Sequence, residues 1–284
     1  MRNIYKNLSL LEHWYNKASS VYYSLRSPNR DASLAKLDEQ LRKNLASLKL
    51  KRQGMAIDLG AGTGYGLSLM HELFPTLRIV GIDISLGMLD VARKNTAVAN
   101  SELVVGDITN LPFINNTFDF GLSILCLHLI PDFKKGLSSI FELLRSDAKF
   151  YFVFFGEEEF HKELLQEYLP NIITEINPDM YQWDLRRLYT FPNKDIVREC
   201  LRSIPHVKKS SLLEVRKIYY LRTFDSFMRP LESRFGLWNS FLTKEQQTRI
   251  RHKLFYFFRR ECKNEGFPAT LHSLTMQGTI KNRE

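Results

Sequence analysis

The chain has 284 residues, of which 44% are hydrophobic and 25% are charged. These are ordinary values for a globular protein, and they exclude a disordered tail, a collagen-like repeat and a disulfide miniprotein. The 40 Lys and Arg residues outnumber the 31 Asp and Glu residues and give a formal net charge of +9. The length suits one large α/β domain with room for an appended lobe.

The charge is distributed unevenly along the chain. Residues 1–52 carry 11 basic and 4 acidic side chains, residues 53–200 carry 12 and 20, and residues 201–284 carry 17 and 7. An acidic middle is therefore flanked by two basic ends. A basic surface can attract nucleic acid, a membrane or an acidic protein, and it can equally be a set of solvated helix faces.

The number of cysteines and the hydropathy of the sequence exclude further classes of protein. Cys126, Cys200 and Cys262 are too few and too scattered for a disulfide framework or a zinc site, so no metal is expected. No run of about 18 apolar residues occurs, so we expect no membrane span. Polar residues interrupt the first 17 positions every few residues, which argues against a secretory signal. We therefore expect a cytoplasmic protein.

Hydrophobic periodicity predicts the elements of the first half in chain order. Leucines at helical spacing predict a helix over residues 31–50. From there on, short apolar runs alternate with helical stripes. The runs predict strands over residues 55–59, 78–82, 103–106, 118–126 and 149–155, and the stripes predict helices that begin near residues 64, 85 and 133. Strands that alternate with helices favour a mostly parallel sheet with helices on both faces.

The pattern changes after residue 156. Residues 157–190 are expected to be helical and irregular, and the stripes that follow predict helices near residues 193–203, 223–235 and 243–264. Alternating residues predict strands over 212–221 and 269–280. A helical insertion therefore precedes the last predicted strand.

A glycine-rich segment follows the first predicted strand and reads Asp58-Leu59-Gly60-Ala61-Gly62-Thr63-Gly64. Glycines allow positive φ and let the backbone approach a ligand closely, and a helix that begins there directs its amide groups toward that ligand. The dinucleotide fingerprint G-x-G-x-x-G fits poorly, because Tyr65 stands in place of its last glycine.

The segment resembles motif I of the class I S-adenosylmethionine-dependent methyltransferases, and three further motifs follow in the family's order. Gly81-Ile82-Asp83-Ile84-Ser85 is similar to the second, Val105-Gly106-Asp107-Ile108 to the third, and Phe118 through Ile130 to the fourth. The resemblance implies a Rossmann-like, seven-stranded, mostly parallel sheet and S-adenosylmethionine as cofactor. Arg145-Ser146-Asp147-Ala148 replaces the family's usual Pro-Gly-Gly-type turn, which suggests a divergent member.

The resemblance assigns cofactor contacts to individual residues. Asp83, just beyond a strand, would accept two hydrogen bonds from the ribose hydroxyls, and Asp107 would accept one from the adenine amino group. Asp58 would orient the glycine loop or meet the cofactor's ammonium through a water. Each of these carboxylates could instead only cap a helix. The remaining expected contacts are Gly60, Ala61, Gly62, Gly64, Ile84, Met88, Ile108 and Leu125.

The sequence identifies the methyl acceptor less clearly than the cofactor. His128 follows the fourth strand and could act as a general base, orient the acceptor or be a hydrogen-bonded structural residue. Residues 190–284 resemble, by pattern, the small-molecule carboxyl O-methyltransferases, which include the malonyl-carrier-protein enzyme of biotin synthesis and trans-aconitate methyltransferase. That resemblance implies an acidic acceptor, either a small molecule or an acyl chain on a carrier protein.

A carrier protein would need a basic docking surface. On the helix expected near residue 250, Arg249, Lys253 and Arg260 share a stripe beside an apolar face formed by Ile250, Leu254 and Phe257. The stripe could dock an acidic partner or be a solvated face. The alternatives are a methyltransferase for RNA or another small molecule, and a non-catalytic protein that keeps the fold. Nucleic acid is the less expected partner, because no RNA-binding module is recognisable.

These inferences divide the chain into three units. We expect an N-terminal helical lid over residues 1–52 and a cofactor-binding core over residues 53–156. The remainder, residues 157–284, would complete the sheet and supply helical acceptor-binding insertions. The sequence indicates no oligomeric state.

Overall fold

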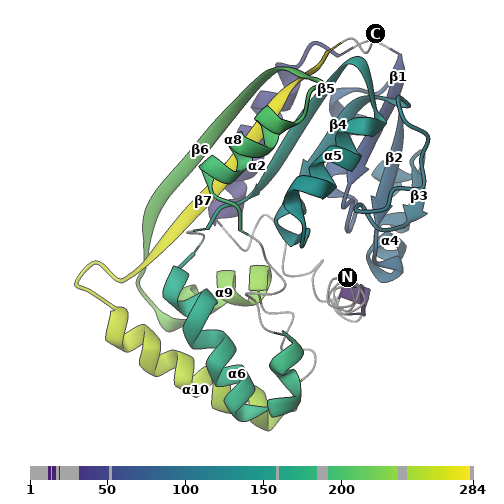
Figure 1. The fold of residues 1–284 in the computed structure, drawn as a ribbon. Helices are drawn as coiled ribbons and strands as arrows, with labels where there is room; N and C mark the ends of the chain where they lie inside the picture. Colours follow the sequence, from purple (N-terminus) through teal and green to yellow (C-terminus); the bar gives the residue numbers. More distant parts are fainter. Residues whose placement is uncertain are drawn as a thin grey trace.

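A computed structural model describes residues 12–13, 15–16, 19, 32–50, 53–157, 160–183, 191–235 and 242–281. Figure 1 shows a twisted sheet with helices packed along it and a second group of helices below. The expected α/β class is therefore confirmed.

Seven strands form one sheet in the order β3-β2-β1-β4-β5-β7-β6. Strands β1 to β5 pair in parallel, and β7 is antiparallel to both β5 and β6. The strands are β1 (Gly54–Leu59), β2 (Leu77–Asp83), β3 (Glu102–Val105), β4 (Phe118–Ile124), β5 (Leu144–Phe155), β6 (Val207–Leu221) and β7 (Phe267–Ile280). The expected seven-stranded, mostly parallel sheet is confirmed.

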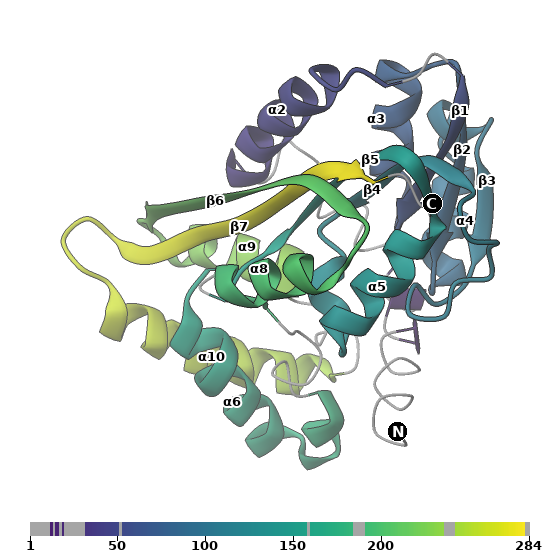
Figure 2. The same cartoon turned by 45° about the horizontal axis from the view of Figure 1, so that its top comes forward.

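Helices cover both faces of the sheet (Figure 2). One face packs against α2 (Ala32–Ala46), α3 (Tyr65–Leu73) and α4 (Leu86–Arg93), and the other against α5 (Phe133–Leu143) and α8 (Lys194–Ser203). A parallel strand covered on both sides needs apolar side chains at successive positions. Residues 150–155 of β5 meet that need, since all six side chains are at most 2% exposed.

Strand β5 begins earlier than the sequence predicted. Residues 145–148 are not a separate turn but lie within the strand, where Asp147 has φ of 63°. Phe118 pairs with Leu144 and Phe120 with Lys149, so the intervening residues of β5 form a bulge. Arg145 holds the bulge through an ion pair with Asp119 at 3.2 Å.

Strands β6 and β7 continue beyond β5. Strand β5 pairs with β7 only as far as Phe155 and Ser273, whereas β6 and β7 pair on to Leu221 and Phe267. The projecting ends lead to α9 (Phe224–Phe235) and α10 (Lys244–Glu261), which lie with α6 (Leu169–Ile176) below the carboxyl ends of the parallel strands (Figure 1). We call α6, α9, α10 and these strand ends the helical lobe.

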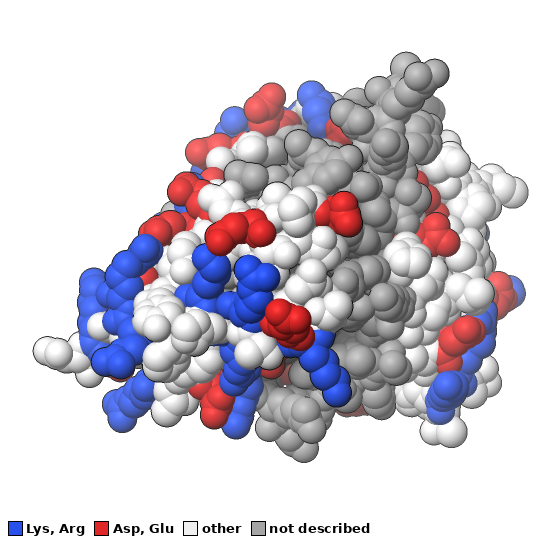
Figure 3. All heavy atoms as spheres, turned by 90° about the horizontal axis from the view of Figure 1, so that it is seen from below, with Lys and Arg blue, Asp and Glu red and all other residues white. Residues whose placement is uncertain are grey.

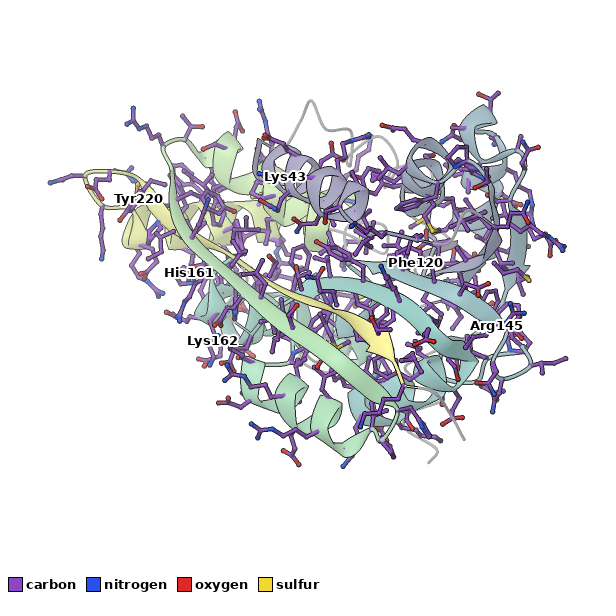
Figure 4. The ribbon with its side chains drawn as sticks, turned by 90° about the horizontal axis from the view of Figure 1, so that it is seen from above. Lys43, Phe120, Arg145, His161, Lys162 and Tyr220 are labelled. Carbon is purple, nitrogen blue, oxygen red and sulfur yellow. The ribbon has the colours of Figure 1, made fainter. Side chains whose placement is uncertain are left out.

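Among the residues labelled in Figure 4, Phe120 lies within the sheet and Tyr220 on the projecting end of β6. The helical lobe has an aromatic core of its own, centred on Phe227, whose ring centroid lies 4.7 Å from that of Phe267 and 5.3 Å from that of Phe258. The predicted apolar face of α10 is buried in this core through Ile250, Leu254 and Phe257. None of the described helices is both long and apolar enough to cross a membrane.

Candidate functional site

The turn after β1 folds back over the end of β2. The amides of Gly60 and Ala61 both donate to the carbonyl oxygen of Ile82 at 2.9 Å. Gly60, Gly62 and Gly64 have φ of 77°, 53° and 87°, a region that disfavours side chains. The turn leads directly into α3, whose first amide groups are directed back toward the strand ends.

The three glycines of this turn serve different purposes. A Cβ on Gly60 would lie 2.2 Å from the Sγ of Cys126, and a Cβ on Gly64 would lie 3.1 Å from the Cβ of Ala92. A Cβ on Gly62 would meet only the carbonyl oxygen of Gly60, at 4.0 Å. Packing within the protein therefore requires Gly60 and Gly64, whereas Gly62 borders open space where a ligand can lie against the backbone.

Asp83 ends β2 beside this turn. Its Oδ2 accepts from the amide of Gly62 at 2.8 Å, and its Oδ1 accepts from the amide of Ser85 at 2.9 Å. The hydroxyl of Ser85 caps α4 by accepting from the amide of Met88 at 3.1 Å, as the sequence predicted. Because Ser85 is the cap, Asp83 is held between the turn and α4 with lone pairs left for a ligand such as a diol.

Asp107 occupies the corresponding place after β3. Its two carboxylate oxygens accept from the amide and the hydroxyl of Thr109, each at 2.7 Å. The amide of Gly106 donates to the backbone oxygen of Asp83 at 2.9 Å, which ties the two loops together. The contacts with Thr109 orient the carboxylate and leave it able to accept from a further donor, such as an amino group.

A third carboxylate, Asp58, is 1% exposed near the end of β1. Burial and, secondarily, the charge of Asp83 raise the pKa of Asp58 to about 7, although an amide hydrogen bond from Leu67 lowers it. The close approach of α3 depends on Gly66, where a Cβ would lie 2.4 Å from the Oδ2 of Asp58.

Burial also raises the pKa of Asp83, against the lowering effect of the amides of Ser85 and Gly62. Two neighbouring carboxylates, one of them fully buried, attract a cation and disfavour a phosphate. The electrostatics of the site therefore suit a positively charged ligand better than a dinucleotide.

His128 lies where β4 turns toward the helical lobe. Leu125 has φ of 56°, which is rare for a non-glycine residue, and the short helix Leu127–Leu129 follows it. The ring of His128 is stacked on Phe191 at a centroid distance of 5.7 Å and lies 5.1 Å from Phe155. The side chain is 3% exposed between these aromatic rings, so a catalytic role for it stays a prediction.

The structure brings the expected cofactor residues to one edge of the sheet. Gly60, Ala61, Gly62 and Gly64 lie in the turn after β1, Asp83 at the end of β2 with Ile84 after it, Asp107 and Ile108 after β3, and Leu125 after β4. The side chains of Met88, Ala61 and Leu125 are 1%, 5% and 8% exposed, so they offer little surface to a ligand. In the described part of the chain, no group of three or more His, Cys, Asp or Glu residues could hold a metal ion.

Sequence reasoning missed Asn16. Its side-chain oxygen accepts from the hydroxyl of Ser85 at 2.8 Å and from the amide of Gly87 at 2.7 Å, directly beside Asp83. The contact joins positions far apart in the chain, so no local pattern could have signalled it. Of the rest of the predicted lid, residues 32–50 are described, and there α2 packs on a face of the sheet; the other positions up to residue 52, apart from residues 12–13, 15 and 19, lie outside the described residues.

Comparisons with known proteins agree with the motifs. A family model described as a methyltransferase domain matches residues 57–152, from β1 to β5. The chain is 25% identical over 284 residues to a malonyl-[acyl-carrier protein] O-methyltransferase of Bacillus anthracis, which covers 98% of this chain and 99% of that protein. It is 32% identical over 103 residues to a demethylmenaquinone methyltransferase of Staphylococcus aureus, which covers 36% of this chain and 43% of that protein. The solved structure of the YcgJ protein from Bacillus subtilis covers 87% of this chain and 100% of its own, at 16% identity and a TM-score of 0.58.

Proposed function

We propose that this chain, a class I S-adenosylmethionine-dependent methyltransferase, methylates a carboxylate of a small acid or of an acyl chain on a carrier protein. Its cofactor is S-adenosylmethionine. The observation that carries the proposal is the match of 99% of the length of a malonyl-[acyl-carrier protein] O-methyltransferase, helical lobe included. The methyltransferase-domain model matches residues 57–152 and therefore says nothing about that lobe.

The edge of the sheet offers S-adenosylmethionine suitable partners. Asp83 would bind the ribose hydroxyls, Asp107 the adenine amino group, and the open face of Gly62 the methionine portion. The cofactor carries a sulfonium and an ammonium against one carboxylate and is therefore a net cation. The two neighbouring negative charges of Asp58 and Asp83 favour a cationic ligand.

Methyl transfer to a carboxylate requires little acid–base catalysis from the protein. An acceptor oxygen attacks the methyl carbon, the carbon–sulfur bond breaks, and a neutral thioether leaves. A carboxylate is already ionised near neutral pH and needs no base, so the protein contributes positioning and exclusion of water. His128 between Phe155 and Phe191 suits such a role, because an apolar wall with one polar group orients an acceptor and keeps water out.

A carrier-bound acceptor would also need a surface for its acidic carrier, and α10 supplies one. Of the predicted stripe, Lys253 is paired with Glu175 at 2.9 Å and Arg260 with Glu163 at 2.8 Å. The outward face of α10 carries Arg249, His252, Tyr256 and Arg259, which we call the α10 stripe. Figure 3 shows Lys and Arg side chains gathered on this side of the molecule. Among the described residues, no ion pair engages Arg249 or Arg259, and the guanidinium of Arg259 lies 5.9 Å from the centre of the Phe255 ring.

Transfer of label from S-adenosylmethionine to a panel of acceptors tests the acceptor class. The panel contains a malonyl-carrier protein, free malonate, a free tricarboxylic acid, a demethylated quinone and bulk RNA. We expect label in a carrier-bound or free acid, in a form that mild alkali releases as methanol, because that lability distinguishes a methyl ester from methyl on carbon or nitrogen. Label confined to the quinone or the RNA would overturn the proposal.

Charge reversal separates carrier-bound from free acceptors. The double variant Arg249→Glu, Arg259→Glu should raise KM for a carrier-bound acid about tenfold or more while KM for the free acid stays unchanged. Lys43→Glu with Lys134→Glu, two exposed cations on α2 and α5, is the matched control. Equal loss in both double variants would show that total charge, and not the α10 stripe, governs docking.

A further inference from the structure

Asn16 is linked to the predicted ribose-binding carboxylate through a single residue. Its side-chain oxygen accepts from the hydroxyl of Ser85 at 2.8 Å. The amide of the same serine donates to the Oδ1 of Asp83 at 2.9 Å. The position of Ser85 therefore depends on Asn16 on one side and Asp83 on the other.

The loop before α4 is shaped to receive Asn16. The amide of Gly87, which α4 leaves without an intrahelical partner, donates to the side-chain oxygen of Asn16 at 2.7 Å. A Cβ on Gly87 would lie 2.9 Å from the backbone oxygen of Asn16 and 3.0 Å from its Cα. The hydroxyl of Ser19 donates to that same backbone oxygen at 3.2 Å. The absence of a side chain at Gly87 is thus what allows the two backbones to touch.

The neighbouring residue faces a different part of the molecule. Tyr15 packs against the core of the helical lobe, while Asn16 contacts the loop before α4. Two consecutive residues therefore connect the lobe that would hold the acceptor with the loop that would hold the cofactor. Loss of the Asn16 contacts would therefore affect both the helical lobe and the loop before α4.

We propose that Asn16 is a positioning residue for the cofactor. It holds the turn from Asp83 to Ser85 in the conformation in which the carboxylate is presented to the ribose. Bound cofactor in turn holds Asn16 against α4, because two equilibria that share Ser85 are linked reciprocally. The inference rests on the proposed cofactor site at Asp83, and its test therefore uses binding rather than turnover.

Titration calorimetry with S-adenosylhomocysteine provides the first test. Asn16→Ala should weaken binding about tenfold, since two hydrogen bonds that fix the loop are lost. Asn16→Asp keeps an acceptor oxygen in place and should bind within about threefold of the unmodified protein. Glu12→Ala, an exposed residue of the same segment, is the control and should change nothing.

A second variant reaches the same contact from the opposite side. Gly87→Ala leaves Asn16 intact but displaces its backbone, so it should weaken binding as much as Asn16→Ala, and the double variant should lose little more. Hydrogen exchange at the amide of Gly87 should become faster in Asn16→Ala, and the ligand should slow it in the unmodified protein. A residue with a merely structural role would lower the melting temperature without moving either readout.

The outcomes separate the two proposals. No binding of S-adenosylhomocysteine to the unmodified protein would contradict the cofactor site itself. Normal binding with unchanged affinity and unchanged Gly87 exchange in Asn16→Ala would overturn the role of Asn16 alone.

Discussion

The cofactor edge and the helical lobe are held together by different kinds of contact. At the edge, backbone amides meet carboxylates at 2.7–2.9 Å, and glycines occupy backbone conformations that other residues avoid. In the lobe, aromatic rings such as those of Phe227, Phe258 and Phe267 pack at centroid distances of 4.7–5.9 Å. The first arrangement allows one residue type at each position, whereas several combinations of side chains can fill the second.

The methyltransferase-domain model matches residues 57–152, which include the cofactor edge and none of the helical lobe. A relative with 32% identity is matched over 103 residues only, while the relative matched from end to end is 25% identical. The contacts of the edge restrict the residues that can stand there, whereas a lobe held by packing tolerates more substitutions. Five predictions test whether the two regions are as separable as this comparison implies.

The largest effect is expected in the lobe. Phe227 is fully buried, so Phe227→Ala should lower the free energy of unfolding by about 3–5 kcal/mol, measured by urea denaturation. Affinity for S-adenosylhomocysteine should stay within about threefold, because the cofactor edge is held by its own backbone contacts. Phe255→Ala, at a side chain that is 36% exposed, should cost less than about 1 kcal/mol. A loss of cofactor affinity that parallels the loss of stability would show that the two regions are not separable.

The next effect is expected at the edge. Asp83→Ala removes the acceptor of two backbone amides together with the predicted ribose contact, so binding of S-adenosylhomocysteine should weaken at least about a hundredfold. The unfolding midpoint of the lobe should move little. Asp90→Ala, an exposed carboxylate of α4 paired with Arg93, serves as the control in calorimetry. Affinity like that of the unmodified protein in Asp83→Ala would mean that the cofactor binds elsewhere.

A pH dependence should distinguish the edge from the lobe as well. The pKa of Asp58 is about 7 in the free protein, and a bound cation lowers it, so binding of S-adenosylmethionine near pH 7 should release a proton. Affinity should fall up to about tenfold from pH 8 to pH 6, because the protonated carboxyl attracts the cation less. Calorimetry in buffers of different ionisation enthalpy measures the proton, and Asp58→Asn should abolish it. S-adenosylhomocysteine, which lacks the sulfonium, should show a weaker dependence.

The same group gives a stability prediction of defined sign. Its folded pKa lies above the value of about 3.9 for an unfolded aspartate, so the folded state binds the proton more tightly. The contribution of Asp58 to stability is therefore most favourable below pH 4 and is lost as the pH rises to 7. An unfolding free energy whose slope is the same in Asp58→Asn would contradict this assignment.

The smallest effect is expected from the surface of the lobe. Arg260 and Glu163 form an ion pair at 2.8 Å, but their side chains are 54% and 50% exposed. A double-mutant cycle with alanine at both positions should give a coupling of less than about 1 kcal/mol, which salt reduces further. Methyl transfer should be unchanged. A larger coupling would mean that charge, and not only ring packing, holds the lobe together.

Local sequence signals predicted much of the cofactor edge. The glycine turn after β1, the carboxylates that end or follow β1 to β3 and the N-cap at Ser85 all follow from neighbouring residues. Strands β4 and β5 are buried on both faces of the sheet, so they are continuous apolar runs in the sequence and could be predicted from it.

Features decided by distant parts of the chain could not be predicted in this way. Strand β6 begins at Val207, five residues before its predicted start, because its polar first residues become a strand only through pairing with β7. The bulge at residues 145–148 is in contact with Asp119 of the neighbouring strand through Arg145. Asn16 contacts Ser85, which lies 69 positions further along the chain. No window of sequence contains both partners of any of these contacts.

The order of strands has a consequence for the synthesis of the protein. Strand β7 lies between β5 and β6 in the sheet, although it follows both along the chain. On the ribosome, the 15 residues of β6 are therefore made before any strand exists beside which they can pair. While it is unpaired, β6 exposes apolar side chains such as Ile218 and is prone to pair with a strand of another chain. Helices α9 and α10 also emerge before β7, but Phe267 of β7 belongs to the core of the lobe, so neither the lobe nor the sheet is complete until β7 has been made.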